Sequence, residues 1–197
     1  MRTRTTSVRP ALGALTAAAA ICLAGAGCGA SAPSPGRAAA KAPVVAIQSR
    51  AWGALRLRSG AVLPYPLSWR RLAGDPGSAS AALLMGDHTV RAYLNATPAQ
   101  AGETLADWGT FRVQHNAAEG DRHVRLLSAR IGFPFGAQRR SCVTDEYATR
   151  VTSYRELACI VAPANGSQAT VLVAAAQPDA WTTQLPALNY AINHFTG

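Results

Sequence analysis

The fold of this chain is decided by residues 142–176, which read CVTDEYATRVTSYRELACIVAPANGSQATVLVAAA. Two runs in this stretch, 142–149 and 152–161, are rich in the β-branched and aromatic residues that favour strands. Only Arg150-Val151 separates the two runs. The sequence therefore predicts an antiparallel hairpin that turns at or around this pair.

A turn at this pair fixes a register with two cross-strand contacts. Cys142 then faces Cys159, and Glu146 faces Arg155 further along the same strands. We expect the two cysteines to form a disulfide bond, which is compatible with an oxidising location outside the cytoplasm. A competing interpretation makes them free thiols for catalysis or metal binding, but no histidine cluster lies near them in the sequence.

The same register has two weak points. It places Asp145 opposite Glu156, which is tolerable if both carboxylates are solvated. Arg-Val is also unfavourable in a tight hairpin turn, because such turns need positive φ and a β-branched residue disfavours it. A longer loop, with the register held by the cysteines, is the alternative.

A third strand and a helix follow. Asn165-Gly166 is a strong hairpin signal and joins the second strand to a third at 170–175. The C-terminal segment predicts a helix with Pro186 in its first turn and Trp181 at its entry or in a short helix before it. The apolar stripe of this helix consists of Leu185, Leu188, Ile192 and Phe195.

Upstream residues predict more strands and one further helix. Alternating or continuous apolar residues predict strands at 55–58, 81–85, 90–95 and 124–131. The helix is expected to start with Thr97 as N-cap, Pro98 at its first position and Gln100 completing a capping box. Its apolar stripe would be Ala101, Leu105, Trp108 and Phe111, with an end near Gly120.

With these elements placed, three segments carry a family resemblance. They are Tyr65-Pro66-Leu67-Ser68-Trp69, the helix after Asn95-Ala96-Thr97-Pro98, and the ending Trp181…Leu185-Pro186-Ala187-Leu188…Ile192-Asn193-His194-Phe195. On these segments the chain resembles PsbP-like proteins over most of residues 50–197. The resemblance implies an α+β fold, an antiparallel β-sheet with flanking helices. It also implies a binding or assembly role, and it carries over no catalytic residue.

The N-terminal segment predicts export. A basic start, an apolar stretch and small residues cover 1–27, which is typical of a signal peptide and too short for a membrane-spanning helix. Cys28 follows directly and resembles the lipid-attachment cysteine of bacterial lipoproteins. The alternative is cleavage at Ala24-Gly25-Ala26 and secretion of a soluble chain, since Gly25 stands where lipoproteins usually have leucine.

Cysteine counting favours the lipoprotein interpretation. If Cys142 and Cys159 pair and Cys22 leaves with the signal, Cys28 is left over for lipidation. Residues 28–43 are mostly Ala, Ser, Pro and Gly and contain no large apolar group, so we expect a disordered tether. Residues 44–197 then form one PsbP-like domain on the outer side of the cell membrane.

Two arginine clusters are candidate contacts for an anion or a partner. Arg70-Arg71 follows Trp69, and Arg139-Arg140 precedes the disulfide strand. An aromatic ring beside arginines can bind an anionic group by stacking and bidentate hydrogen bonds. The alternative places Trp69 in the core and the arginines in water. We expect no nucleic-acid partner for an exported chain, even though basic residues outnumber acidic ones 19 to 10.

Recognisable catalytic motifs are absent from the sequence. It contains no G-x-S-x-G, H-E-x-x-H, P-loop or paired C-x-x-C, and its four histidines are scattered. We therefore expect no catalytic residue, cofactor or metal. The expected function is a lipid-anchored, non-catalytic binding or assembly module at the cell envelope, with an envelope protein or lipid as partner. A lipid or glycolipid carrier and a secreted hydrolase are the alternatives.

Overall fold

A computed structural model describes residues 51–197. The predicted signal, Cys28 and the tether lie outside the described residues. The described part contains two helices and nine strands. In chain order these are β1 Trp52–Arg56, β2 Val62–Pro66, β3 Arg70–Leu72, β4 Ala79–Leu84, β5 Val90–Pro98, α1 Trp108–Ala118, β6 Arg122–Phe135, β7 Gln138–Ala148, β8 Ser153–Ala162, β9 Thr170–Ala176 and α2 Pro178–Asn193.

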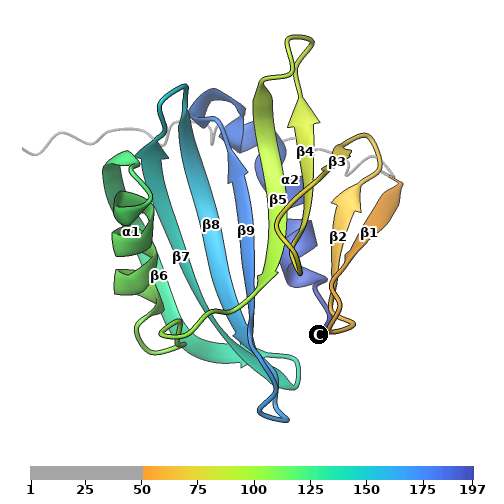
Figure 1. The fold of residues 1–197 in the computed structure, drawn as a ribbon, viewed down its shortest axis with the longest axis vertical. Coiled ribbons are helices and arrows are strands. Elements are labelled where there is room, and N and C mark those ends of the chain that lie inside the picture. Colours follow the sequence, from red (N-terminus) through yellow and green to blue (C-terminus); the bar gives the residue numbers. More distant parts are fainter. Residues whose placement is uncertain (1–50) are drawn as a thin grey trace, which may run out of the picture. The chain divides into compact units, whose positions relative to one another are not determined.

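Seven of the strands form one antiparallel sheet in the order β3-β4-β5-β9-β8-β7-β6, and β1 and β2 form a separate hairpin. The helices cover opposite faces of the large sheet. Helix α1 lies over β6 and β7 at one end, whereas α2 lies behind β9 and β5, next to the β1–β2 hairpin (Figure 1). The result is the α+β architecture that the sequence predicts.

Strand β9 explains why the core forms where it does. It is the middle strand of the seven, and all of its residues are buried. A strand covered on both faces needs a continuous apolar run, which Val171 to Ala176 supplies. Successive residues of β9 point to opposite faces of the sheet and therefore belong to two different clusters of the hydrophobic core. Leu172 packs with Leu188 of α2, and Val173 packs with Trp108 of α1.

The hairpin of β7 and β8 has the predicted register. Cys142 pairs with Cys159 and the two form a disulfide bond, while Glu146 pairs with Arg155 and forms an ion pair with it. Arg150-Val151 does form the turn, and neither residue has positive φ. The Thr149 hydroxyl stabilises this turn, because it accepts hydrogen bonds from the backbone amides of residues 151 and 152.

The predicted start of the first helix is wrong. Thr97 and Pro98 belong to β5, where they pair with Val171 and Thr170. Strand β4 pairs no further along β5 than Ala96, so Pro98 needs hydrogen bonds on one side only. Gly102 has φ +90, which ends any helix there, and α1 begins ten residues later than predicted, at Trp108. The end near Gly120 is confirmed.

The second helix is longer than predicted. Pro178, not Pro186, occupies its first turn, and Pro186 lies in its interior on the exposed side. Trp181 is part of the helix and buried, and Leu188 and Ile192 face the core as expected. Phe195 lies beyond the helix end but is also buried.

The disulfide bond is expected to stabilise the fold by about 2–3 kcal/mol, because it closes a loop of moderate length in the unfolded chain. Urea unfolding of the full chain with and without reductant measures this contribution. In a Cys142→Ala/Cys159→Ala variant, reductant should have no effect. Equal stability of the wild type with and without reductant would contradict the expectation.

Candidate functional site

The candidate site is a cleft of about 380 Å³ between α2 and the hairpin of β6 and β7. Asn189 and Asn193 lie one helical turn apart on α2 and form one wall. Arg130, Phe133 and Arg140 form the opposite wall. The disulfide bond, Leu157 and Ile192 form the apolar floor.

A β-bulge brings the arginines and the aromatic ring together. In a regular strand, Arg130 and Phe133 would point to opposite faces because they are three residues apart. The pairing of β6 with β7 shifts between these two residues, where Gly132 has φ +62. The extra residue turns Phe133 to the face that carries Arg130, directly opposite Arg140 on β7.

Both guanidinium groups stack on phenylalanine rings. The guanidinium carbon of Arg130 lies 4.1 Å from the ring centroid of Phe133. That of Arg140 lies 4.8 Å from Phe133 and 4.3 Å from Phe135. Arg140 also donates a hydrogen bond of 3.0 Å from Nη2 to Oδ1 of Asn193. Its Nε and Nη1 atoms are buried and have no hydrogen-bond partner among the described residues.

The cleft is electrostatically positive. All ten acidic residues of the chain lie between Asp75 and Asp179, and none of them lines this cleft. The ion pairs formed within 51–197 involve other arginines, such as Arg91 and Arg125. Burial, together with the positive charge of Arg130, lowers the pKa of Arg140. The cleft thus concentrates two like charges that no carboxylate of the chain neutralises.

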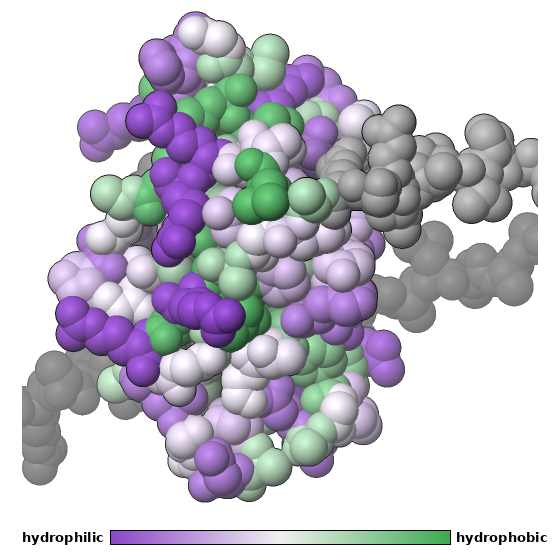
Figure 2. Space-filling model, turned by 90° about the vertical axis from the view of Figure 1, so that its right-hand side faces the viewer, coloured by the Kyte–Doolittle hydropathy of each residue, from purple (hydrophilic) through white to green (hydrophobic). Residues whose placement is uncertain are grey.

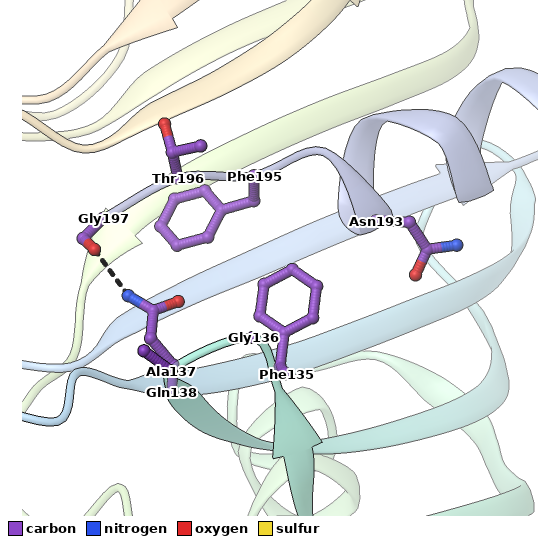
Figure 3. Close-up of a pocket in the computed structure, with 8 residues that line it drawn as sticks. All are labelled: Phe135, Gly136, Ala137, Gln138, Asn193, Phe195, Thr196 and Gly197. Atoms are coloured by element: carbon purple, nitrogen blue, oxygen red, sulfur yellow. Dashed lines mark hydrogen bonds between the residues drawn. The ribbon is translucent and has the colours of Figure 1, made fainter.

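A second hollow of about 390 Å³ adjoins the first at Asn193, which lines both. The side chains of Phe135 and Phe195 point toward each other across it, and Gln138 donates a hydrogen bond to a main-chain oxygen of Gly197 at its far end (Figure 3). This hollow carries no charged side chain. It extends the charged cleft with an aromatic region.

The structure separates the two predicted arginine clusters. Trp69 is buried in the core, with 4% of its surface exposed, while Arg70 and Arg71 are exposed on β3. Strands β3 and β7 lie near opposite ends of the seven-stranded sheet, so the two clusters do not meet. On the side of the domain near β1 and β2, hydrophilic groups alternate with small, separate hydrophobic areas (Figure 2). Of the five predicted contacts, Arg140 alone lines the cleft, and the neighbouring Arg139 is exposed and donates to the Gly132 carbonyl.

A buried polar cluster lies on the other face of the sheet, beneath α1. Arg112 of α1 binds Glu156 of β8 with two hydrogen bonds, 2.6 Å from Nε and 2.9 Å from Nη2. The Tyr147 hydroxyl also donates to Glu156, and Tyr93 lies 2.6 Å from that hydroxyl. Burial and the charge of Glu156 raise the pKa of Tyr93 well above its usual range. The hydrogen bonds between Arg112 and Glu156 hold α1 against the sheet.

Asp145 and Glu156 are paired across β7 and β8 as expected, but the expectation that they are solvated is wrong. Neither residue has any exposed surface. The Arg112 guanidinium neutralises Glu156. Asp145 accepts one hydrogen bond of 3.3 Å from Asn116, and its Oδ1 has no partner. Burial, followed by repulsion from Glu156, raises the pKa of Asp145 to about 7.

These buried carboxylates are not placed to act on a substrate, because both are sealed beneath α1 and away from solvent. His123 is exposed at the start of β6 with φ +55, and His115 lies 3.8 Å from Glu119 on α1. Within residues 51–197, no group of three or more His, Cys, Asp or Glu side chains is arranged to hold a metal ion. The cleft at Arg130 and Arg140, in contrast, combines two cationic side chains with an open polar surface.

Sequence reasoning missed Arg130 and Phe133. A signal was present, because Gly136-Ala137 between Phe135 and Gln138 is a two-residue hairpin turn. That turn pairs Phe133 with Arg140 and would have placed the Phe-Pro-Phe segment beside the second arginine cluster. The bulge at Gly132, which brings in Arg130, has no comparable signal.

Comparisons with known proteins identify the fold. No protein-family model matches the chain, and no curated protein sequence matches it. The solution structure of cyanobacterial PsbP from Synechocystis matches with a TM-score of 0.54 and 15% identity, over 77% of this chain and 95% of that one. The fold is therefore PsbP-like, as the sequence resemblance implies.

Two other solved structures are similar at lower scores. A Pseudomonas aeruginosa protein described as a putative regulator, PA94, has a TM-score of 0.49 and 13% identity, over 74% of this chain and 96% of that chain. LpqN of Mycobacterium tuberculosis, described as involved in cell envelope biogenesis, has a TM-score of 0.45 and 18% identity, over 69% and 82%. Among the described residues, neither helix is long and apolar enough to cross a membrane.

Proposed function

We propose that this chain is an exported lipoprotein, anchored through Cys28, whose PsbP-like domain is a non-catalytic binding or assembly module at the cell envelope. The observation that carries the binding role is the cleft at Arg130 and Arg140. It offers cations and amide groups to a partner, on a surface open to solvent. The anchoring role rests on the N-terminal sequence.

The chemistry of the cleft supports binding over catalysis. Nucleophilic or acid–base catalysis needs a nucleophile and a general base within hydrogen-bonding reach of each other. The cleft has the hydroxyls of Ser128 and Thr144, but no histidine, aspartate or glutamate lines it. Its polar side chains carry guanidinium, amide and hydroxyl groups, which can recognise a partner by charge and hydrogen bonds.

The packing behind α2 also favours a binding module over a lipid carrier. A carrier would need a large apolar cavity between the helix and the sheet. That space is filled by a continuous cluster of buried side chains, which includes Leu94, Leu172, Leu188 and Ile192. The hollows described above open instead at the edge of this cluster.

The anchor is tested by replacing Cys28 with serine in the full chain. We expect the wild type to enter the detergent phase of a membrane extract and to carry the mass of acyl groups on an N-terminal Cys28. The Cys28→Ser variant should lose that mass and leave the detergent phase. Cys22→Ser is the matched control, since this cysteine lies within the predicted signal. A wild-type product that begins at residue 27 without added mass would contradict the anchor and support secretion.

A further inference from the structure

We propose that the cleft between α2 and the β6–β7 hairpin binds the phosphate group of an organic phosphate ester, with Arg130 and Arg140 as its cationic ligands. This inference rests on the proposed binding function and names the chemical class that the cleft recognises. It depends on three features of the cleft: the placement of its charges, the state of its hydrogen-bond donors and the shape of its lining.

The first feature is two guanidinium groups that share one aromatic ring. Stacking on Phe133 holds both in fixed positions, at 4.1 Å and 4.8 Å from its centroid. The positive charge of Arg130 disfavours the charged form of Arg140, and no Asp or Glu carboxylate within residues 51–197 forms an ion pair with either side chain. An anion bound in the cleft would attract both guanidinium groups and so offset their mutual repulsion.

The second feature is the unused hydrogen-bonding capacity of the same side chains. Arg140 donates a hydrogen bond from Nη2 to Asn193, while its Nε and Nη1 are buried without partners among the described residues. A buried donor without an acceptor costs about 1–3 kcal/mol, so such atoms in a native protein call for an explanation. Arg130 is exposed on β6 and makes no hydrogen bond or ion pair within the described residues, so its whole fork can contact a ligand.

The third feature is the combination of polar and apolar surfaces around the charges. Asn189 on α2 and the hydroxyls of Ser128 and Thr144 supply neutral donors at the rim, and the disulfide bond, Leu157 and Ile192 form an apolar floor. The adjoining hollow adds Phe135 and Phe195 (Figure 3). A phosphate ester matches this lining, because its oxygens can accept from several donors at once while its organic part lies on the apolar and aromatic surface.

Isothermal titration of the purified full chain in detergent tests the proposal with three probes: inorganic phosphate, glycerol 3-phosphate and dihexanoyl phosphatidylglycerol below its micelle concentration. We expect saturable binding of at least one probe, and at least tenfold weaker binding to Arg140→Gln. Arg130→Gln should weaken binding as well, and it cannot disturb the core because the side chain is exposed. Arg71→Gln, on the exposed strand β3, is the matched control and should bind like the wild type.

The probes also identify the source of the phosphate group. Tighter binding of the short-chain lipid assigns the cleft to a lipid headgroup, and equal or tighter binding of glycerol 3-phosphate or inorganic phosphate assigns it to a soluble phosphate. The proposal is overturned if no probe binds, or if binding is the same in Arg130→Gln, Arg140→Gln and Arg71→Gln. Partner capture at the cleft without phosphate binding would overturn this inference and leave the proposed function intact.

Discussion

Arg112→Met is expected to destabilise the full chain by about 3–5 kcal/mol, which is the usual cost of removing one partner from a buried ion pair. The guanidinium of Arg112 is the group that neutralises Glu156, whose side chain has no exposed surface. Methionine keeps most of the length and packing of arginine but leaves the carboxylate buried and uncompensated. Urea unfolding at neutral pH, monitored by tryptophan fluorescence, measures the loss.

Two variants show whether charge is the cause. In the double variant Arg112→Met/Glu156→Gln the buried charge is gone, so most of the lost stability should return. Arg125→Met removes an exposed partner of Glu146, which also binds Arg155, and should cost less than about 1 kcal/mol. A loss below about 1 kcal/mol in Arg112→Met itself would show that the pair does not fasten α1 to the sheet.

Asp145→Asn is expected to be more stable relative to the wild type at pH 7 than at pH 4. In the unfolded chain, Asp145 loses its proton near the ordinary aspartate pKa of 3.8, whereas burial and Glu156 raise its pKa to about 7 in the folded protein. Between these values the folded state binds more protons than the unfolded state, so stability falls as pH rises. Linkage at about 1.4 kcal/mol per pH unit limits the effect to about 4 kcal/mol. Asparagine removes it.

The measurement is the difference in unfolding free energy between Asp145→Asn and the wild type, taken at several values from pH 4 to pH 7. Titrating groups remote from Asp145 cancel in this difference because both proteins contain them. Asp87→Asn is the control, since Asp87 is exposed in the turn between β4 and β5 and its pKa is lowered, mainly by a hydrogen bond from the Thr89 amide. A difference that is flat with pH, or that shrinks toward pH 7, would contradict a buried proton on Asp145.

The β7–β8 hairpin was predictable because local sequence specifies it. Two strand-forming runs with a short gap admit few registers, and the cysteines select the one that also pairs Glu146 with Arg155. The first helix was less predictable, because Thr97 and Pro98 satisfy the rules for a helix start and for a strand end equally well. Pairing with β9, more than seventy residues later in the chain, decides for the strand.

The surroundings of the polar groups were also hard to predict, because they depend on residues that are far away in the sequence. Whether Asp145 and Glu156 are solvated depends on Arg112, which is 44 residues from Glu156 and reaches it only because α1 packs on that face. Likewise, the cleft needs the bulge at Gly132 and the approach of Asn193 from α2. Local patterns identified Arg140 as a candidate but could not supply its neighbours.

If the cleft between α2 and the β6–β7 hairpin is the binding surface of a membrane-held module, crosslinking in intact cells should capture its partner there. A photoreactive phenylalanine replaces Ser128, exposed at the cleft, or Arg150, exposed at the β7–β8 turn. We predict a discrete crosslinked product from position 128 that is absent from position 150 and is lost when Cys28 is replaced by serine. The same products from both positions, or a product from position 150 alone, would contradict the claim.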